Sequence, residues 1–443
     1  MLKINPKPVN MHEVPPFGIN INYLRDDDSN RPQARPMEVA VKDTGMRFLR
    51  YPGGGKSNHV LFFDPPNTNG KAMPLTKTYI KFSEWANMME FDTFIDICKK
   101  TGCEPHVVVG CGVHINIDND DIDLERYFHN AVEWVHYANI TKGYGVKYWE
   151  IGNENWNKKK YDASEFGDIV ARFAKAMKEV DPSVKIGASG NDQEWWSAFL
   201  PKAAPHIDFL TVSEYACWGY RDYETYAYTE ANLTGTAQTA LSSIEKYAPE
   251  HKDRLFVAVV EFNARDYSWD FEWEGWVSEN NLGHALANID MCGQMALNDK
   301  IKYGMIWTTR WMHQRQQHDD IFYGFDANNG LMPSTMCLYL WGRFMRKNVL
   351  KVENVPEGVV AFASANETGL TVFLINKRVN AVDVTLEGFD GLPAGAEVKN
   401  YVFTGNNPSD LYPEFRQRDS LKLGETHNLP PYSCTVWDVG NNR

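Results

Sequence analysis

Two glutamates adjoin apolar, strand-like segments, and their setting could support proton transfer and nucleophilic attack. Glu154 comes shortly after the segment 146–152, and Glu261 closes the segment 254–261. Two carboxylates that face each other across a cleft are the apparatus of glycoside hydrolysis. One must be protonated so that it can give a proton to the leaving oxygen, and the other must be ionised so that it can attack the anomeric carbon. The two glutamates therefore predict a glycosidase, provided that the fold brings them together.

Other polar residues at strand ends could hold the two carboxylates in these different states. Arg50, in the segment 46–51, could lie near Glu261 and favour its ionised form. Asn153 offers an amide that could hydrogen-bond a sugar hydroxyl. Glu150 shares the face of Glu154 in strand alternation but lies deeper, which favours a buried structural carboxylate.

The elements that must position these residues can be read from the hydrophobic pattern. Eight short apolar segments alternate with helix-like stretches: 17–23, 46–51, 104–110, 146–152, 184–189, 207–213, 254–261 and 302–307. Strands that are apolar on both faces and alternate with helices imply a parallel sheet. Eight such units predict an α/β fold, a (β/α)8 TIM barrel over residues 13–346. Catalytic groups of such barrels lie at the carboxyl ends of the strands, where Arg50, Glu154 and Glu261 would meet.

The pattern changes after about Lys347. Short alternating segments are separated by turns rich in Gly, Asn and Pro, which predicts a C-terminal antiparallel β-sandwich domain over residues 347–443. Residues 1–12 could add a strand to this domain. No flexible linker separates it from the barrel, so we expect the two to pack firmly together.

Composition excludes several classes of protein. The net charge of −13 argues against nucleic acid and anionic membranes as partners, and the longest apolar run, Leu255–Val260, is too short to span a membrane. Seven scattered cysteines without a C-x-x-C motif argue against a disulfide scaffold and a structural zinc site. We expect a carbohydrate substrate and no metal or other cofactor, and a homo-oligomer is left open. The N-terminus lacks a signal peptide, which indicates a cytoplasmic protein, or a periplasmic or secreted one whose signal was removed.

Three motifs carry a resemblance to known enzymes. "LRYPGG" (49–54), "YWEIGNE" (148–154) and "VEFN" (260–263) resemble the motifs of clan A glycoside hydrolases, most closely the α-L-arabinofuranosidase family. That resemblance implies a retaining double displacement on a plant or algal polysaccharide or a derived oligosaccharide. By position, it implies Glu154 as the acid/base and Glu261 as the nucleophile, supported by Asn153 and Arg50.

Departures from the family pattern mean that the resemblance does not fix which sugar is the substrate. Gly55 stands where the family has Asn, and Glu214-Tyr215 stands where it has a His-Tyr pair, although Tyr215 could still donate to Glu261. Trp307 resembles a tryptophan that lies under the sugar in other families of the clan. A β-glycanase acting on xylan, galactan or an agar-type substrate is therefore the alternative. An alternative of another class is a non-catalytic carbohydrate-binding barrel, which would usually have lost one carboxylate.

Weaker signals come from the loops that follow strands. His114 and Trp311 could contact substrate, and a structural role for His114 is equally compatible with the sequence. Trp218 and Trp276 also follow strands and could form stacking platforms, as could Trp269 and Trp273. "GGGKS" (53–57) is similar to a phosphate-binding loop, but Arg50 replaces the first glycine of that motif. Nucleotide binding is therefore disfavoured.

Overall fold

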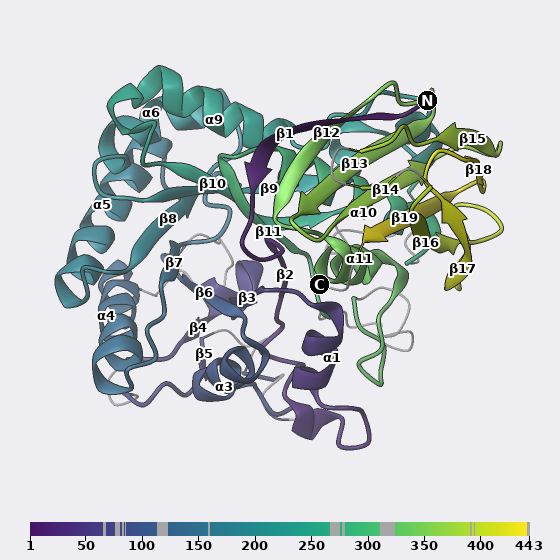
Figure 1. The fold of residues 1–443 in the computed structure, drawn as a ribbon. Coiled ribbons are helices and arrows are strands. Elements are labelled where there is room, and N and C mark those ends of the chain that lie inside the picture. Colours follow the sequence, from purple (N-terminus) through teal and green to yellow (C-terminus); the bar gives the residue numbers. More distant parts are fainter. Residues whose placement is uncertain are drawn as a thin grey trace.

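The computed structural model shows a closed barrel of strands surrounded by helices, with a group of antiparallel strands beside it (Figure 1). The structure describes residues 1–64, 68–75, 80–81, 84, 86–112, 123–157, 160–265, 275–276, 280–310, 324–389, 392–393 and 395–440. None of the helices in these ranges is long and apolar enough to cross a membrane.

The barrel confirms the predicted (β/α)8 architecture. Its strands are β2 (Phe17–Asn20), β3 (Phe48–Tyr51), β6 (Glu104–Val109), β7 (Tyr148–Ile151), β8 (Lys185–Ser189), β9 (Phe209–Tyr215), β10 (Phe256–Asn263) and β11 (Ile301–Ile306). Each strand pairs in parallel with its sequence neighbours, and β11 closes the ring against β2. Each of the eight predicted strand segments corresponds to one of these strands.

A helix follows every barrel strand and covers its outer face. The helices are α1 (Met37–Thr44), α3 (Phe91–Thr101), α4 (Leu124–Val135), α5 (Ala163–Val180), α6 (Gln193–Ala203), α9 (Gly235–Tyr247), α10 (Leu282–Leu297) and α11 (Met336–Phe344). Short helices α7 (Ala216–Gly219) and α8 (Tyr223–Ala227) lie between β9 and α9, and a π-helical turn (His136–Thr141) extends α4. Two-residue strands β4 (Val60–Leu61) and β5 (Met73–Pro74) pair after β3. The short 3₁₀ turns are Asp28–Asn30, Gly54–His59, Pro249–His251 and Pro333–Thr335.

Local signals explain where the helices begin and end. In α5, the Asp162 side chain accepts from the Glu165 backbone N–H while the Glu165 side chain accepts from the Asp162 N–H, which is a reciprocal cap. The α3 helix ends at Gly102, whose φ of 70° is the left-handed conformation that glycine adopts without a steric penalty. These caps set the residues at which α5 begins and α3 ends.

The interior of the barrel is apolar at one end and polar towards the other. The apolar cluster contains Phe48, Phe209, Ala258, Val260, Tyr303 and Met305. The rings of Phe48 and Tyr303 stack with their centroids 4.4 Å apart. Above this cluster the inward side chains are polar and buried, and Arg50 on β3 is among them. A packed floor thus supports a buried polar layer near the carboxyl ends of the strands.

The C-terminal region is the predicted antiparallel β-sandwich. Its seven-stranded sheet runs in the order β1-β12-β13-β14-β19-β16-β17, and β15 pairs with β18 in a second, two-stranded sheet. The strands are β1 (Lys3–Met11), β12 (Asn348–Glu353), β13 (Val359–Asn366), β14 (Gly369–Asn376), β15 (Val382–Thr385), β16 (Glu397–Thr404), β17 (Glu414–Lys422), β18 (Thr426–Leu429) and β19 (Ser433–Gly440). A core that includes Leu350, Leu374, Val384 and Trp437 lies between the two sheets.

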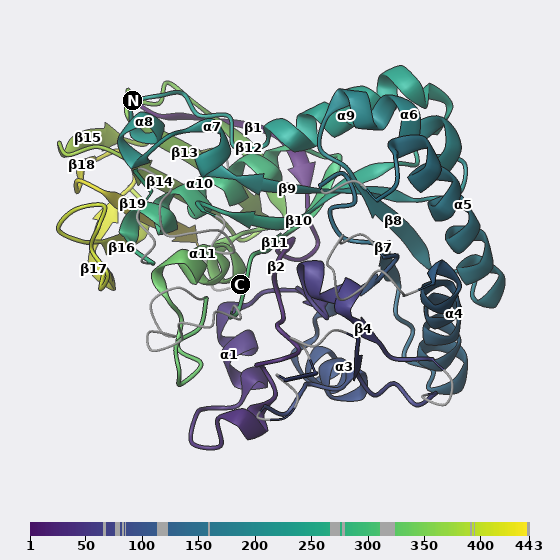
Figure 2. The ribbon, with the colours of Figure 1, turned by 180° about the vertical axis from the view of Figure 1, so that it is seen from behind.

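The other face of the seven-stranded sheet packs on the barrel. Trp341 of α11 stacks on Phe373 of β14 with the ring centroids 4.1 Å apart. Both side chains belong to one buried cluster that continues into the barrel. Seen from behind, α8 lies beside the C-terminal strands as well (Figure 2). The sandwich is therefore joined to the barrel by a continuous apolar core.

Candidate active site

Glu261 lies near the end of β10 and is held by side chains from two other strands. Arg50 Nη1 donates a 2.8 Å hydrogen bond to Glu261 Oε1, and the Tyr215 hydroxyl donates a 3.1 Å bond to Glu261 Oε2. The Glu261 side chain is only 6% exposed. Donation by an arginine and a phenol to the same carboxylate favours its ionised form.

An irregularity in β10 turns Glu261 into the barrel. Ala258 and Val260 belong to the cluster inside the barrel, whereas Val259 and Phe262 pack outward. Strict alternation would send Glu261 outward with Val259. The pairing of β10 with β9 shifts register between Val259 and Glu261, so that Val260 and Glu261 both face inward.

Arg50 also binds a second, deeper carboxylate. Its Nε and Nη2 atoms lie 2.9 and 2.8 Å from Glu150 Oε2. Glu150 Oε2 lies 3.0 Å from His106 Nε2, and Glu150 Oε1 accepts a 2.7 Å bond from the Thr211 hydroxyl. Burial would raise the pKa of Glu150, but the charge of Arg50 and the contact with His106 hold it below its usual value. Burial lowers the pKa of His106, which favours the neutral ring. Glu150 thus anchors Arg50.

Glu154 occupies a tight turn directly after β7. Gly152 and Glu154 have φ values of 69° and 48°, in the left-handed region that a non-glycine residue adopts at an energetic cost. The Glu154 side chain is partly exposed, and its Oε1 accepts a 2.7 Å hydrogen bond from the Ser213 hydroxyl. Asn153, between them, accepts a 2.7 Å bond from Arg50 Nη2 at its Oδ1. The turn therefore points consecutive residues at Arg50 and at β9.

Ser213 connects the surroundings of the two glutamates. It contacts Glu154 through its hydroxyl, and its Cα is the register partner of Glu261 across the pairing of β9 with β10. Neighbouring strands lie about 5 Å apart. The structure thus places Glu154 and Glu261 at the same rim of the barrel.

Trp307 follows β11 and lies beside Glu261. A side chain at Gly54 would lie 2.3 Å from Trp307 Cη2 and 3.0 Å from Glu261 Oε1, so glycine is needed for this approach. The Lys56 ammonium lies 4.5 Å from the centroid of the Trp307 ring. Burial lowers the pKa of Lys56 to about 7. Asn263 Nδ2 donates a 2.6 Å bond to the Trp307 carbonyl and thereby ties β10 to the segment after β11.

Glu214 points away from this site. Its carboxylate accepts a 2.8 Å bond from the backbone N–H of Ala237 in the first turn of α9. Burial raises the pKa of Glu214 to about 8, although hydrogen bonds from this turn act in the opposite direction. Glu214 is therefore a buried partner of the helix, and its neighbour Tyr215 is the one that reaches Glu261.

The remaining predicted site residues fall into two groups. His114 and Trp311, with Trp269 and Trp273, lie outside the described residues. Trp218 is 43% exposed with its ring centroid 4.8 Å from that of Tyr215, whereas Trp276 is buried. Trp218 can thus offer a stacking surface, and Trp276 contributes to packing.

Sequence reasoning missed several residues of the site: Asn20, Lys56, His106, Thr211 and Ser213. Their hydrogen bonds and charge contacts join strands that are far apart in the sequence. Asn20 Oδ1, for example, accepts a 2.9 Å bond from Arg50 Nη1. Polar residues near the carboxyl ends of barrel strands can be recognised in the sequence as site candidates. The sequence does not show which residues they hydrogen-bond.

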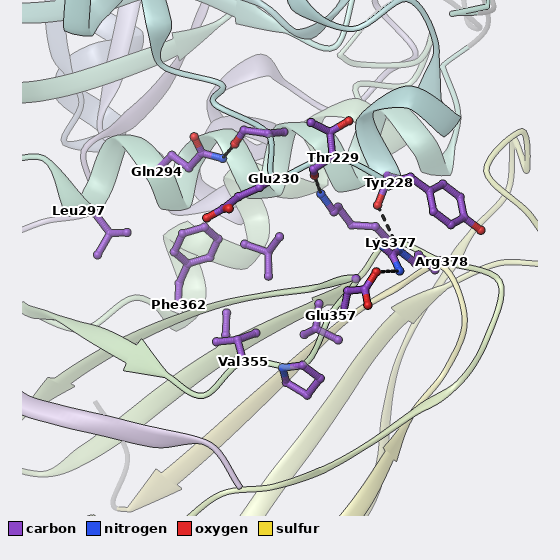
Figure 3. Close-up of a pocket in the computed structure, with 17 residues that line it drawn as sticks. Tyr228, Thr229, Glu230, Gln294, Leu297, Val355, Glu357, Phe362, Lys377 and Arg378 are labelled. Atoms are coloured by element: carbon purple, nitrogen blue, oxygen red, sulfur yellow. Dashed lines mark hydrogen bonds and ion pairs between the residues drawn. The ribbon is translucent and has the colours of Figure 1, made fainter.

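A cavity of about 660 Å³ lies elsewhere, between the barrel and the sandwich (Figure 3). Its walls come from residues 227–231 and from residues 355–362. Arg378 Nη1 lies 2.7 Å from Glu357 Oε1, and Lys377 Nζ donates a 3.0 Å bond to the Thr229 carbonyl. The bond from Lys377 connects the two parts of the chain, whereas the Arg378–Glu357 pair lies within the sandwich.

Comparison with known proteins gives matches in sequence and in structure. A sequence profile described as "Alpha-L-arabinofuranosidase 1 domain" matches residues 40–231. An intracellular exo-α-(1→5)-L-arabinofuranosidase 1 from Bacillus subtilis is 26% identical over 225 residues, which are 44% of this chain and 41% of that protein. The corresponding enzyme of Acetivibrio thermocellus is 22% identical over 59% of this chain and 52% of its own length. The chain thus spans about half the length of the curated relatives that it matches.

The structural match covers more of the chain. The crystal structure of an α-L-arabinofuranosidase from Thermotoga maritima superposes with a TM-score of 0.74 at 18% identity, over 99% of both chains. That match shows the same fold, a barrel with a β-sandwich. The predicted resemblance to the α-L-arabinofuranosidase family of clan A is therefore confirmed, in sequence over residues 40–231 and in fold over nearly the whole chain.

Proposed function

We propose that this protein is a retaining glycoside hydrolase that acts on α-L-arabinofuranosides, with Glu154 as acid/base and Glu261 as nucleophile. The observation that carries the proposal is the position of Ser213 between the two glutamates. Ser213 donates to Glu154 and stands in register with Glu261, which itself accepts from Arg50 and Tyr215. One carboxylate is thus partly exposed and accepts from a neutral hydroxyl, and the other is buried beside a fixed positive charge. These are the settings that a proton donor and an ionised nucleophile need.

The chemistry follows in two displacements. Protonated Glu154 gives its proton to the glycosidic oxygen while Glu261 Oε attacks the anomeric carbon, so the glycosidic bond breaks and a glycosyl ester forms on Glu261. Glu154, now ionised, takes a proton from a water molecule whose oxygen attacks the same carbon. The ester bond breaks, Glu261 leaves as a carboxylate, and the sugar keeps its anomeric configuration.

The other polar groups have supporting roles in this proposal. Because Asn153 Oδ1 already accepts from Arg50, the amide N–H₂ of Asn153 is the group suited to a sugar hydroxyl. Trp307 would lie against the sugar beside Glu261, and Tyr215 would hold the nucleophile in position. His114 and Trp311 stay proposed substrate contacts on the grounds of sequence.

The relatives support an arabinofuranoside, because they are named as exo-α-(1→5)-L-arabinofuranosidases. We propose the same neutral sugar here, in a plant or algal polysaccharide or an oligosaccharide derived from one. An intracellular location is proposed on the same names, and the seven buried, free cysteines suit a reducing compartment. We propose two domains, the barrel over 13–346 and the sandwich over 347–443, with β1 contributed to the sandwich by residues 1–12. Whether the protein forms a homo-oligomer can be measured by light scattering.

The test is hydrolysis of aryl α-L-arabinofuranosides and arabinan oligosaccharides beside a set of β-glycans, with products identified by mass. Release of arabinose is the expected result. Cleavage of xylan, galactan or an agar-type polysaccharide without any arabinose release would reject the proposed sugar and leave the two glutamates in the same roles. Binding of these carbohydrates without any cleavage would reject the enzyme.

A further inference from the structure

Lys56 is a buried cation beside the candidate nucleophile that the proposed chemistry does not use. It belongs to the 3₁₀ turn after β3 and is 1% exposed. Its Nζ lies 4.5 Å from the centroid of the Trp307 ring. Trp307 and Glu261 Oε1 both lie against Gly54, two residues before Lys56 in the same turn. The lysine, the tryptophan ring and the carboxylate therefore form one local group.

The buried charges around Glu261 explain why a second cation is needed there. Glu150 and Glu261 are both buried carboxylates, and Arg50 forms ion pairs with both of them. Two negative charges and one positive charge in a water-poor interior leave a net negative charge, which is unfavourable. His106, which is favoured as a neutral ring, does not compensate it. Lys56 supplies a second positive charge on the side of Glu261.

Another nearby acid has cations of its own. Asp26 Oδ1 lies 2.8 Å from Arg310 Nη1 and 3.7 Å from Arg31 Nη2. Asp26 is therefore already surrounded by positive charge, so the carboxylate with the greater need of Lys56 is Glu261.

We propose that Lys56 is a positioning residue whose ammonium, held over Trp307, keeps the nucleophile Glu261 ionised. This inference rests on the proposed function, in which Glu261 must be ionised to attack. Burial lowers the pKa of Lys56 to about 7, and Glu261 and Asp26 partly oppose that effect. Lys56 therefore carries its charge in acidic solution, where Glu261 would otherwise bind a proton, and loses that charge as the pH rises through about 7. The charged or titratable groups that face this pair are Asp26 after β2, Arg50 on β3 and Tyr215 on β9. Glu150 on β7 and His106 on β6 lie behind Arg50.

The experiment compares the pH dependence of kcat/KM for the wild type and Lys56→Met on a dinitrophenyl α-L-arabinofuranoside. This leaving group needs no proton, so the acid limb reports the ionisation of Glu261. Loss of this neighbouring unit charge should move that limb to higher pH by about 1 unit. At pH values well below the midpoint of that limb the variant should thus be about tenfold slower, and at pH 9 the two rates should converge because Lys56 is then neutral in the wild type as well. Lys56→Arg should restore the acid limb.

A matched control is Lys99→Met. Lys99 Nζ lies 4.2 Å from the Tyr144 ring centroid on the exposed side of α3, so this change removes the same kind of contact far from Glu261. Its pH profile should match the wild type. An unshifted acid limb in Lys56→Met, or an equal loss of rate at every pH, would overturn the role of Lys56. If Met is not tolerated, Lys56→Gln serves the same comparison.

Thermal unfolding provides a readout that does not need activity. A lysine with a folded-state pKa of about 7 and an unfolded value of about 10.4 binds fewer protons when folded across that window. The stability of the wild type relative to Lys56→Met should therefore rise between pH 7 and pH 10. Parallel Tm curves would show that the pKa of Lys56 is not lowered, and would contradict the predicted convergence of the rates at pH 9. If the wild type cleaved no glycoside at all, the proposed function would fail, and these curves alone would decide whether Lys56 is a buried titrating cation.

Discussion

The two glutamates differ most in what surrounds them. Glu261 accepts from Arg50 and Tyr215 and is almost inaccessible to solvent, whereas Glu154 is partly exposed and accepts from Ser213. A fixed cation stabilises a carboxylate, and a neutral hydroxyl can serve either protonation state. The difference supports the assignment of Glu261 as the ionised partner and Glu154 as the one that carries a proton.

Glu154→Ala tests that assignment through the leaving group. Without a general acid, substrates with poor leaving groups should lose about 10²–10⁴ in kcat/KM. An aryl glycoside with a dinitrophenolate leaving group should lose far less, because its oxygen departs without a proton. The matched control is Glu150→Gln, which removes a neighbouring carboxylate and should affect both substrates alike. Equal losses on both substrates in Glu154→Ala would remove the acid/base role.

Residue types at strand ends could be predicted from the sequence, but their partners could not. The motifs around Glu154 and Glu261 stood out because polar residues interrupt apolar strands. Ser213 is one small hydroxyl within an ordinary strand, and its importance comes from its register with Glu261. Lys56 resembled part of a phosphate-binding loop, whereas its ammonium in fact lies over Trp307. Both roles depend on contacts between distant parts of the sequence.

At the scale of elements, the barrel strands were predictable because each is an apolar segment bounded by turn residues. The strands β17 and β18 were not predicted. The β17 strand is exposed along most of its length and carries charged side chains on both faces, so it shows no alternation. Its strand conformation comes from pairing with β16. Edge strands of this kind take their structure from a neighbour rather than from a hydrophobic pattern.

The contact between β9 and α9 makes a prediction about stability. Glu214 has a folded-state pKa of about 8, whereas an unfolded glutamate titrates near 4.3. The folded protein therefore binds more protons between these values, and its stability should fall as the pH rises from 5 to 8. Glu214→Gln keeps an acceptor for the Ala237 N–H and does not titrate. Between pH 5 and pH 8, the free energy of unfolding of Glu214→Gln should rise by roughly 3 kcal/mol relative to that of the wild type.

Denaturant unfolding at pH 5 and pH 8 measures this effect. The exposed Glu194 on α6 provides the control, because Glu194→Gln should leave the pH dependence of the wild type unchanged. A constant difference between Glu214→Gln and the wild type at both pH values would show that Glu214 is already ionised at its helix.

At the scale of the whole molecule, the barrel and the sandwich share one apolar core. Phe373 is fully buried and stacks on Trp341. Removing its ring should cost about 3–5 kcal/mol. Because the cluster runs into both parts, Phe373→Ala should lower the unfolding midpoint of barrel and sandwich together, in a single transition. For the same reason, a chain cut near residue 346 should be insoluble.

Circular dichroism and tryptophan fluorescence followed through the same denaturant titration test this coupling. Phe389→Ala, on the partly buried far side of the sandwich core, is a control whose cost should be smaller. Two separate transitions, with the barrel midpoint unchanged in Phe373→Ala, would show that the sandwich is an independent module. A soluble, fully active fragment ending near residue 346 would show the same.

The most direct measurement is the site at which a sugar becomes attached to the enzyme. An activated 2-deoxy-2-fluoro arabinofuranoside should form a glycosyl ester that hydrolyses slowly, and peptide mass spectrometry should locate it on Glu261. The label should be absent from Glu261→Gln, while Glu214→Gln should still be labelled. The same mechanism predicts that the first product keeps its anomeric configuration, which NMR can measure. It also predicts that the nearest carboxylate oxygens of Glu154 and Glu261 lie about 5–5.5 Å apart. A label on Glu154 or Glu214, or an inverted product with no label, would contradict it.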